Sequence, residues 1–419
     1  MKFSAKLDAL LKAISPVMAV SETGAIKEHP DSYRITLIAN KTGLVAESNN
    51  GNIAARREIS ASDVDYNVVT QGEITTVTKN LSNVLASFDA NEVLTFELNN
   101  GEMEIRPESD PEKLQTLPIE VRKIEMPILA TQFSKTVTVS KAVLSETISK
   151  VFWGIGTEDL RPEFYHWPLK FSKDVVIAAA GDGGRFAVDE VSGSGLVDAK
   201  GTIDILIYKD QNAALYKSLE MVDSDTVEIK EFVRKDSDKE PDQIVFVLGD
   251  FVLILMGHDP KANWPDISKY TNRFGTPYQF TTDASDWVKE FQGVVATISK
   301  EVRDINDVHT TKMVFDSNKK VLTLKVEGSM KAVRKIPLLD AVVASGSPPI
   351  LEFSVETANL KDMFKYASGT MQFEAIDSKK PMMVRYFADK KVQSGPLYKV
   401  NQSAQTKEQF MIFFGSFNK

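Results

Sequence analysis

Residues 135–153 read KTVTVSKAVLSETISKVFW and carry the pattern that decides the fold. The first part, KTVTV, alternates polar and apolar residues, as a β-strand with one buried face does. After Ser140, a plausible helix N-cap, apolar residues recur at three- and four-residue spacing as far as Val151. The stretch therefore predicts a strand that leads directly into an amphipathic helix.

This strand–helix pattern occurs six times along the chain. The predicted helices are Lys6–Met18, Lys79–Phe88, Ser140–Phe152, Tyr208–Leu219, Ala284–Lys300 and Thr357–Tyr366. Their starts lie 73, 61, 68, 76 and 73 residues apart, and one sixth of the 419 residues is about 70. Each helix follows an alternating strand (MKFSA, GEITTV, KTVTV, GTIDILI, YQFTTD, PILEFSV) and precedes two or three strands separated by turn residues. The spacing predicts six copies of one unit. The alternative is an ordinary α+β protein in which helices and strands alternate by chance.

Two units make one domain, so the sequence predicts an α+β protein of three tandem domains. Each domain should hold two helices packed on antiparallel sheets of about eight strands. Proline-rich polar stretches at 107–130 and 261–277 place the domains at 1–128, 129–272 and 273–419. When units join edge to edge with their helices on one side, most strand edges are paired and so protected from aggregation. Closure into a ring would pair the remaining edges. A ring of this kind favours a homo-oligomer of few subunits.

The composition excludes several classes of protein. With 42% apolar and 26% charged residues the chain is globular, and no apolar run is long enough for a membrane span. The N-terminus lacks the pattern of a signal peptide, so we expect a cytoplasmic protein with no membrane partner. Cysteine is absent, which excludes disulfides and thiolate metal sites.

The charge is distributed unevenly. The chain carries 50 basic and 58 acidic side chains, a net charge of −8, yet the six predicted helices carry 11 lysines and 6 acidic residues. An acidic protein can still surround nucleic acid if its positive charge lies on one surface, where it attracts phosphates without reading bases. The alternative is an ordinary solvated helix face.

Several segments, in order and spacing, resemble the beta subunit of bacterial DNA polymerase III, the sliding clamp. They are MKFSAKLDALLKAI, VTVSKAVLSETISKVFW, DLRPEFYHWPLKF, VIAAAGDGGRFAV, GDFVLILMGHDPKANWPDISKY and ILEFSVETANLKDMFKY. The resemblance implies a homodimeric ring of three clamp domains per chain that encircles double-stranded DNA independently of sequence. It implies a processivity factor for DNA replication, not an enzyme, with no cofactor and no metal. The implied partners are a DNA polymerase, a clamp loader and other proteins with clamp-binding peptides.

The resemblance also implies a pocket for partner peptides between the second and third domains. The matching positions are Phe164, Gly183, Arg185, Phe186, Pro265, Lys269, Tyr270, Met411, Ile412 and Phe414. Aromatic residues replace several aliphatic residues of the family, which predicts a shallower pocket or a different peptide preference. Without the resemblance, Phe186, Ile412 and Phe414 are better interpreted as core strand residues than as pocket residues.

For DNA, Lys27 and Arg161 match basic positions that contact duplex in the family. With the helix lysines, the predicted DNA-facing set is Lys12, Lys27, Lys79, Lys141, Lys150, Arg161, Lys209, Lys217, Lys289, Lys361 and Lys365. The dimer positions of the family match Leu114 and Ile298. Beside them stand Glu112 and Thr297 where the family has larger apolar residues, which predicts a dimer that dissociates more readily than is typical.

Other chemistry has weak support in the sequence. The four histidines, at 29, 166, 258 and 309, lack the spacing of a zinc site, and GDGGR lacks the lysine and hydroxyl residue of a P-loop and is predicted to be a hairpin turn. The long segment 388–409 indicates a divergent clamp, of bacterial or phage origin. Two alternatives stay open: a clamp-like decoy or structural protein that binds clamp-interacting peptides without encircling DNA, and an α+β enzyme with a dispersed active site.

Overall fold

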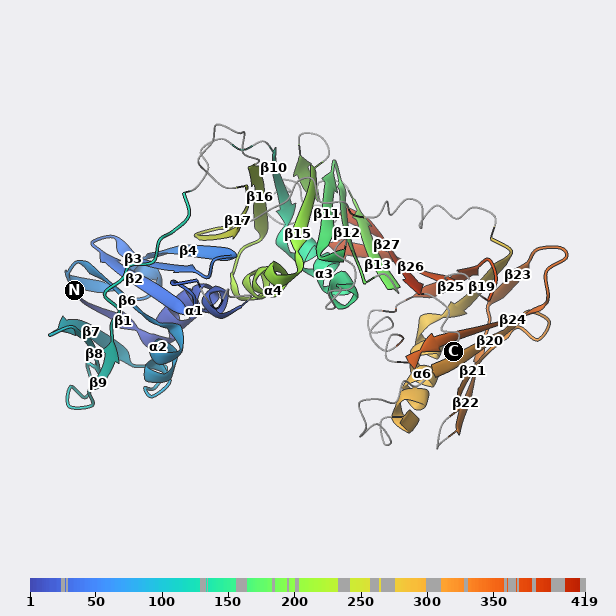
Figure 1. The fold of residues 1–419 in the computed structure, drawn as a ribbon, viewed down its shortest axis with the longest axis horizontal. Coiled ribbons are helices and arrows are strands. Elements are labelled where there is room, and N and C mark those ends of the chain that lie inside the picture. Colours follow the sequence, from blue (N-terminus) through green and yellow to red (C-terminus); the bar gives the residue numbers. More distant parts are fainter. Residues whose placement is uncertain are drawn as a thin grey trace. The chain divides into compact units, whose positions relative to one another are not determined.

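The protein was analysed as a computed structural model of residues 1–419, and the ribbon in Figure 1 shows its strands and helices. The structure describes all residues except 24–26, 28, 129–132, 134, 156–163, 183–184, 194–195, 200–202, 233–241, 257–263, 265–275, 299–309, 328–330, 358–359, 361–366, 368, 379–381, 393–403 and 415–419. Within the described residues, no helix is long and apolar enough to cross a membrane.

Five of the six predicted helices are confirmed. They are α1 (Leu7–Glu22), α2 (Thr78–Leu85), α3 (Lys141–Val151), α4 (Asn212–Met221) and α6 (Ala284–Ile298). Short 3-10 turns are η1 (Ala61–Asp63), η2 (Phe152–Gly154) and η4 (Lys209–Gln211), the last of which leads into α4. The sixth predicted helix, 357–366, lies largely outside the described residues.

The strands repeat as predicted. In chain order they are β1 (Lys2–Lys6), β2 (Arg34–Asn40), β3 (Gly43–Asn49), β4 (Ile53–Ser60), β5 (Asn67–Thr70), β6 (Gly72–Val77), β7 (Val93–Asn99), β8 (Glu102–Pro107), β9 (Gln115–Pro118), β10 (Lys135–Ser140), β11 (His166–Ser172), β12 (Val175–Gly181), β13 (Arg185–Ser192), β14 (Val197–Ala199), β15 (Ile203–Tyr208), β16 (Thr226–Phe232), β17 (Gln243–Leu248), β18 (Phe251–Met256), β19 (Tyr278–Asp283), β20 (Thr310–Asp316), β21 (Val321–Glu327), β22 (Lys331–Pro337), β23 (Asp340–Val343), β24 (Ile350–Glu356), β25 (Thr370–Ala375), β26 (Met382–Val392) and β27 (Ala404–Phe414). Each repeat consists of one strand, a helix position and three strands, and the short strands β5, β14 and β23 are additions to this scheme.

The chain forms two compact units. The first comprises residues 1–145 and 197–261, and the second comprises 146–196, 262–394 and the strand β27. The predicted domain boundaries after residues 128 and 272 stay predictions.

In the first unit, a nine-stranded antiparallel sheet crosses from one repeat to another. Its order is β14-β10-β16-β17-β18-β4-β3-β2-β6, and a second sheet has the order β5-β1-β7-β8-β9. The pairing of β18 with β4 joins the last strands of the fourth and first repeats, with Ile254 opposite Ala54. Both residues are buried together with Val245 in one apolar cluster. Strand pairing across about 200 residues of sequence therefore makes one continuous sheet.

In the second unit, the equivalent pairing joins β13 to β27. The strands β11-β12-β13-β27-β26-β25-β19-β23 follow one another in one antiparallel sheet, and β22-β21-β20-β24 form another. The strand β13 is the last of the third repeat and β27 is the last of the sixth. As in the first unit, the sheet is therefore continued by pairing the last strands of two repeats. Stacked rings of Phe280 and Phe315 and the buried Trp287 fill the core between the two sheets.

The helix α1 ends four residues later than predicted. Its periodic apolar stripe suggested an end at Met18, but the structure continues to Glu22. Ser21 is fully buried and its hydroxyl contacts that of Thr78 at 2.7 Å, while the Asn50 amide donates to the Val20 carbonyl at 2.7 Å. Partners from distant segments stabilise this last turn, which the local pattern does not reveal.

The strand junction in the first unit leads to a stability prediction. Replacing Ile254 by alanine should lower the free energy of unfolding by about 2–5 kcal/mol, because it leaves a cavity where β18 meets β4. Urea denaturation followed by circular dichroism measures the change. The matched control is V69A at an exposed position on β5, which should change the free energy by less than about 0.5 kcal/mol. Equal effects of the two substitutions would contradict a packed junction.

Candidate functional site

The helix α1 presents a lysine on the side opposite its buried stripe. Leu10, Ile14 and Val17 are fully buried against the nine-stranded sheet. Lys12 projects from the other side, and its side chain is 72% exposed. This division follows from the 3.6-residue period, since positions 10, 14 and 17 share one face and position 12 does not.

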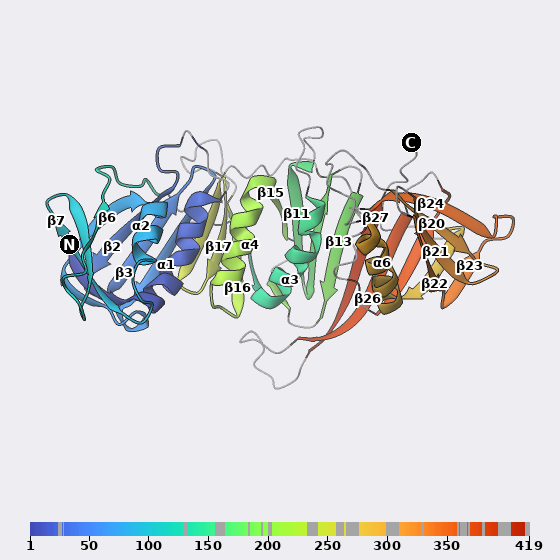
Figure 2. The same cartoon turned by 90° about the horizontal axis from the view of Figure 1, so that it is seen from below.

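The helix α4 lies beside α1 and adds a second lysine (Figure 2). Lys217 is exposed, and its Nζ donates to the Thr23 hydroxyl at 3.4 Å. Lys12 Nζ lies 4.0 Å from Asp223 in a highly exposed pair, which is worth at most about 1 kcal/mol. Two predicted positions about 200 residues apart therefore lie on neighbouring helices. Because the contacts of Lys12 with Asp223 and of Lys217 with Thr23 are weak, both ammonium groups stay accessible to an anion.

An arginine that the sequence did not single out positions this surface. Arg57 on β4 donates to the carboxylate of Asp250 at 3.0 and 3.1 Å. It also donates to the main-chain carbonyls of Lys12 and Ala13 at 3.4 and 3.1 Å. Arg57 thus ties α1 to the turn between β17 and β18, and no local sequence motif signals this role.

The other predicted DNA-facing residues differ in exposure. Lys27, Lys79 and Lys289 are exposed and Lys209 is half-buried. Lys141 directs its Nζ to the carbonyl of Val222 at 2.7 Å. The predicted positions that lie outside the described residues are Arg161, Lys361 and Lys365.

Lys150 is a correction to the predicted set. Its side chain is only 6% exposed, and its Nζ lies 3.2 Å from a carboxylate oxygen of Glu146. The residues Thr147 and Val151 are fully buried, so α3 turns this side of the helix inward. The count of helix lysines did not reveal which face each lysine occupies.

The segment GDGGR connects two paired strands, as predicted. Gly181 at the end of β12 pairs with Phe186 of β13 in an antiparallel register. Asp182 accepts from the main-chain N–H and from Nε of Arg185, at 3.0 and 2.9 Å. The guanidinium of Arg185 lies 5.3 Å from the centre of the Trp153 ring. The hairpin prediction is confirmed, and the turn holds Arg185 at the sheet end.

Three aromatic rings gather next to this hairpin. The Phe164 ring lies 5.4 Å from Phe186 and 5.5 Å from Trp264, in edge-to-face arrangements. Phe186 and Trp264 pack on the buried Met383. We call Phe164, Phe186 and Trp264 the aromatic cluster. Phe164 and Phe186 were predicted to line a peptide pocket, whereas Trp264 was missed although it directly precedes the predicted Pro265.

Some of the remaining predicted pocket residues lie outside the described residues, and the others lie on β27. Gly183, Pro265, Lys269 and Tyr270 lie outside the described residues. The backbone of β27 places Phe414, Ile412 and Met411 opposite Arg185, Ala187 and Val188 of β13. Distant segments that the resemblance grouped together are therefore neighbours in the sheet, while a pocket function stays a prediction.

The predicted dimer positions lie next to two outer strands. Leu114 is exposed directly before β9, and Ile298 is the last residue of α6, which packs on β22. The strand β9 is the outermost of the five-stranded sheet, and β22 is the outermost of the four-stranded sheet. Each sheet therefore ends in a strand with one edge unpaired within the described residues.

Titratable groups give no indication of a catalytic centre in the part of the chain that the structure describes. Burial raises the pKa of Tyr66 to about 12, and burial raises the pKa of Tyr386 well above its usual value. These phenols lie in different units. Among the described residues, no three His, Cys, Asp or Glu side chains are grouped to hold a metal ion.

Solved bacterial sliding clamps have the same fold over the whole chain. The DNA polymerase III subunit beta from Pseudomonas aeruginosa matches with a TM-score of 0.75 at 13% identity, over 100% of both chains. The DNA polymerase sliding clamp from Bacillus subtilis matches with a TM-score of 0.76 at 13% identity, over 100% of this chain and 99% of that one. The beta sliding clamp from C. crescentus gives 0.76 at 17% identity, over 100% of both. No protein-family model and no curated protein matches the sequence.

The comparisons confirm the fold that the sequence predicts: the chain has the architecture of the three-domain sliding clamps. Its low identity to them indicates a divergent version of that architecture.

The aromatic cluster allows a test of how firmly its framework is packed. Replacing Phe164 by alanine should lower the free energy of unfolding by about 3–5 kcal/mol, because a 5% exposed ring that contacts two others is removed. The control R185A breaks a partly exposed ion pair and should cost about 1 kcal/mol or less. Chemical denaturation with tryptophan emission as the readout compares both variants, and a loss below about 1 kcal/mol for F164A would argue against a packed cluster.

Proposed function

We propose that this protein is a DNA sliding clamp, a non-catalytic processivity factor that encircles double-stranded DNA as a homodimeric ring and tethers a polymerase. The observation that carries the proposal is the exposed lysine surface of α1 and α4, in a chain of clamp fold and net charge −8. Lysines without base-reading partners bind phosphates independently of sequence. An otherwise acidic chain would confine DNA to such a surface.

The two outer strands β9 and β22 support closure of the ring by a second copy. Within the chain, β4 pairs with β18 and β13 with β27, so the last strands of four repeats are joined in pairs. The last strands of the second and fifth repeats, β9 and β22, have no such partner among the described residues. Two copies related by a two-fold axis would pair β9 of each with β22 of the other.

The charges beside these strands are complementary. Residues 102–113 carry five acidic and two basic side chains, whereas β22 carries Lys331, Arg334 and Lys335. Exposed Leu114 and Val333 supply an apolar contact within each edge. Opposite charges favour this pairing in register, while the small apolar area supports a dimer that dissociates readily.

The aromatic cluster is the proposed docking site for partner peptides, which include those of the polymerase and the clamp loader. Phe186 and Trp264 are partly exposed on a buried floor of Ala179, Val188 and Met383. Aromatic side chains on such a floor are the usual anchors of peptide recognition.

Topological linkage to DNA is the experiment that tests this function, and it needs no loader. The protein is incubated with linear duplex biotinylated at both ends, streptavidin is added, and NaCl is raised to about 1 M, where the Debye length is only ~3 Å. A threaded ring stays on duplex whose ends are blocked by streptavidin. On control duplex without streptavidin, it slides off the open ends. Equal loss from both would support the decoy or structural alternative.

The lysine surface is tested in the same system at equilibrium and at lower salt. The double variant K12A/K217A should reduce the salt dependence of binding, since each lost phosphate contact lowers the slope by roughly 0.9. The matched control K41A changes an exposed lysine in the turn between β2 and β3, away from this surface, and should leave the slope unchanged.

Charge reversal on β22 tests the proposed dimer. K335E should weaken self-association about tenfold or more, because Lys335 is exposed on β22 and a like charge then faces an acidic edge. Light scattering across a dilution series should show the intact protein near 93 kDa, twice the 46.5 kDa of one chain, and the variant nearer the monomer. Adding E112R to K335E should restore the dimer. An unchanged dimer in K335E, or a monomer at every concentration of the intact chain, would contradict the interface.

A further inference from the structure

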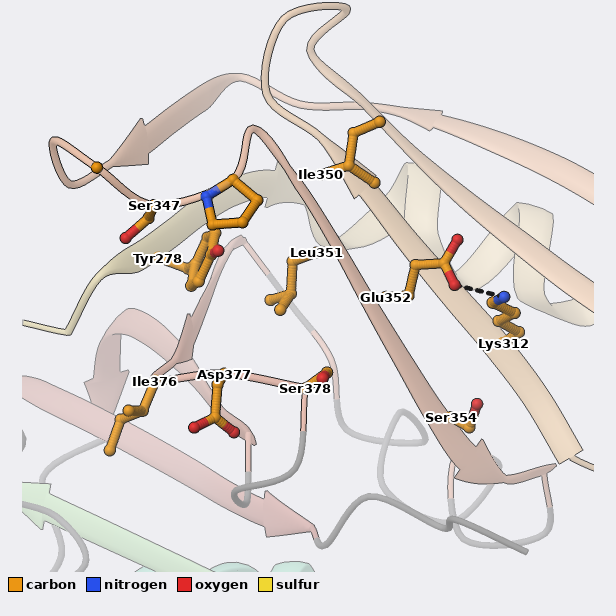
Figure 3. A pocket seen from close by; sticks show the side chains of 12 residues that line it. Tyr278, Lys312, Ser347, Ile350, Leu351, Glu352, Ser354, Ile376, Asp377 and Ser378 are labelled. Carbon is orange, nitrogen blue, oxygen red and sulfur yellow. Dashed lines mark ion pairs between the residues drawn. The ribbon is translucent and has the colours of Figure 1, made fainter.

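Within the part of the chain that the structure describes, the strand β24 in the second unit has one edge without a strand partner, beside a hollow. Among the described residues it pairs with β20 and stands last in its sheet. The hollow has a volume of about 740 Å³, and the ion pair of Lys312 and Glu352 projects along one side of it while Ile376, Asp377 and Ser378 form the opposite side (Figure 3). An unpaired edge next to open space is where an extended chain can add as a further strand.

The internal repeat identifies the counterpart of β24 in the first unit. The strand β6 occupies the same place in the second repeat that β24 occupies in the sixth. Both strands end shortly before a buried threonine, Thr78 and Thr357. Counting back from these threonines, Ser354 is equivalent to Thr75 and Glu352 to Glu73. Thr75 pairs with Thr36 of β2, as Ser354 pairs with Lys312 of β20.

In the first unit this edge is covered by residues 118–123, which bridge to β6 at Glu120 and then bend at residues 121–122. The main-chain N–H of Glu120 donates to the Thr75 carbonyl at 2.7 Å, and the two residues form an antiparallel bridge. The Thr76 hydroxyl donates to the Pro118 carbonyl at 2.8 Å. Lys123 forms an ion pair with Glu73. The chain itself therefore shows how an edge of this kind is filled: one main-chain bridge and one lysine–glutamate pair.

We propose that the edge of β24 and its hollow bind an extended partner segment in this manner, with a lysine or arginine of the partner paired to Glu352. The inference rests on the proposed function, because the partner segment is a continuation of the peptide that docks at the aromatic cluster. The segment runs antiparallel to β24 and forms its main-chain bridge at Ser354. Its basic residue lies three positions after the bridging residue, as Lys123 lies three after Glu120.

The charge and lining of the hollow match such a segment. Among the described residues that line it, Glu352 and Asp377 are acidic and Lys312 is basic. The Lys312–Glu352 pair, at 2.5 Å, is about half exposed on both sides, so a second cation can share the carboxylate at little cost. Tyr278 and the exposed Ile350 add apolar surface for the partner's side chains.

The hollow and the aromatic cluster are connected through paired strands of the second unit. Met383, which belongs to the buried cluster against which Phe186 and Trp264 pack, pairs across strands with Glu374. Ile376 and Asp377, which line the hollow, follow Glu374 by two and three residues. One cross-strand step of about 5 Å and two or three residues at ~3.3 Å each separate the two sites. A partner segment of roughly eight to ten extended residues can therefore contact both.

The probe is a fluorescein-labelled synthetic peptide with the sequence of residues 115–125, QTLPIEVRKIE, which contains the segment that covers β6. Fluorescence anisotropy measures its binding to the full-length protein. The substitution E352K should weaken binding about fivefold or more, and K312A should strengthen it about two- to fivefold, because the carboxylate loses its competing partner. A probe whose Lys123 position carries glutamate should bind E352K better than it binds the intact protein.

The matched control is E73K on β6, the equivalent carboxylate of the first unit. It should leave binding of the probe unchanged, and loss with E73K but not with E352K would place the probe on β6 and overturn the inference. A variant that ends at Phe414 provides a second test. A large gain in affinity on this truncation would assign the edge to the chain's own residues 415–419 and would also overturn it.

These outcomes separate the inference from the proposed function. Probe binding that responds to E352K without any linkage of the protein to end-blocked DNA would retain the edge site and reject the clamp. Linkage to DNA with no probe binding, or with binding that E352K does not change, would retain the clamp and reject the edge site.

Discussion

Main-chain pairing between the last strands of distant repeats is the interaction on which the rest of this structure depends. A strand at a sheet edge leaves N–H and C=O groups without partners, which costs free energy when they are buried and invites aggregation when they are not. The chain meets this constraint by pairing β4 with β18 and β13 with β27. Each pairing joins two repeats into one sheet, and the buried contact of Ala54 with Ile254 stabilises the first of these junctions.

The same pairing brings together the two helices that carry Lys12 and Lys217. Because β4 and β18 are neighbours, the helices of the first and fourth repeats are packed side by side on one sheet. Lys12 and Lys217 lie exposed on these two helices, beside the acidic residues Asp8 and Glu22 of α1 and Glu220 of α4. Arg57 bonds to both the turn after β17 and the α1 backbone, so the strand junction also fixes the helix that carries Lys12. The charge pattern is thus a product of sheet continuity, and disruption of the junction would separate these lysines.

Local features of the fold were predictable from the sequence, whereas features made by distant partners were not. Helix and strand periodicities are local, so five helices, the repeat and the turn after Gly181 follow from spacing alone. Whether the Lys150 side chain is buried depends on which face α3 turns inward. The later end of α1 depends on contacts with Thr78 and Asn50. Trp264 joins the aromatic cluster although no periodic pattern in the sequence singles it out. The resemblance therefore supplied positions for a candidate site, whereas residues that packing alone brings together were missed.

At 13% identity, this chain shares the fold of the clamps and little of their residue identity. The fold requires alternating apolar positions, helix stripes and strands able to pair, and many sequences satisfy these requirements. A phosphate-attracting surface requires positive charge at exposed positions, and a lysine at any of several helix positions can provide it. Peptide docking is more demanding, because an anchor side chain must fit a shaped floor. Divergence should therefore preserve the fold and the sign of the charged surface while it changes the proposed docking site, and the three aromatic rings at Phe164, Phe186 and Trp264 are where its peptide preference should differ most from that of the clamps.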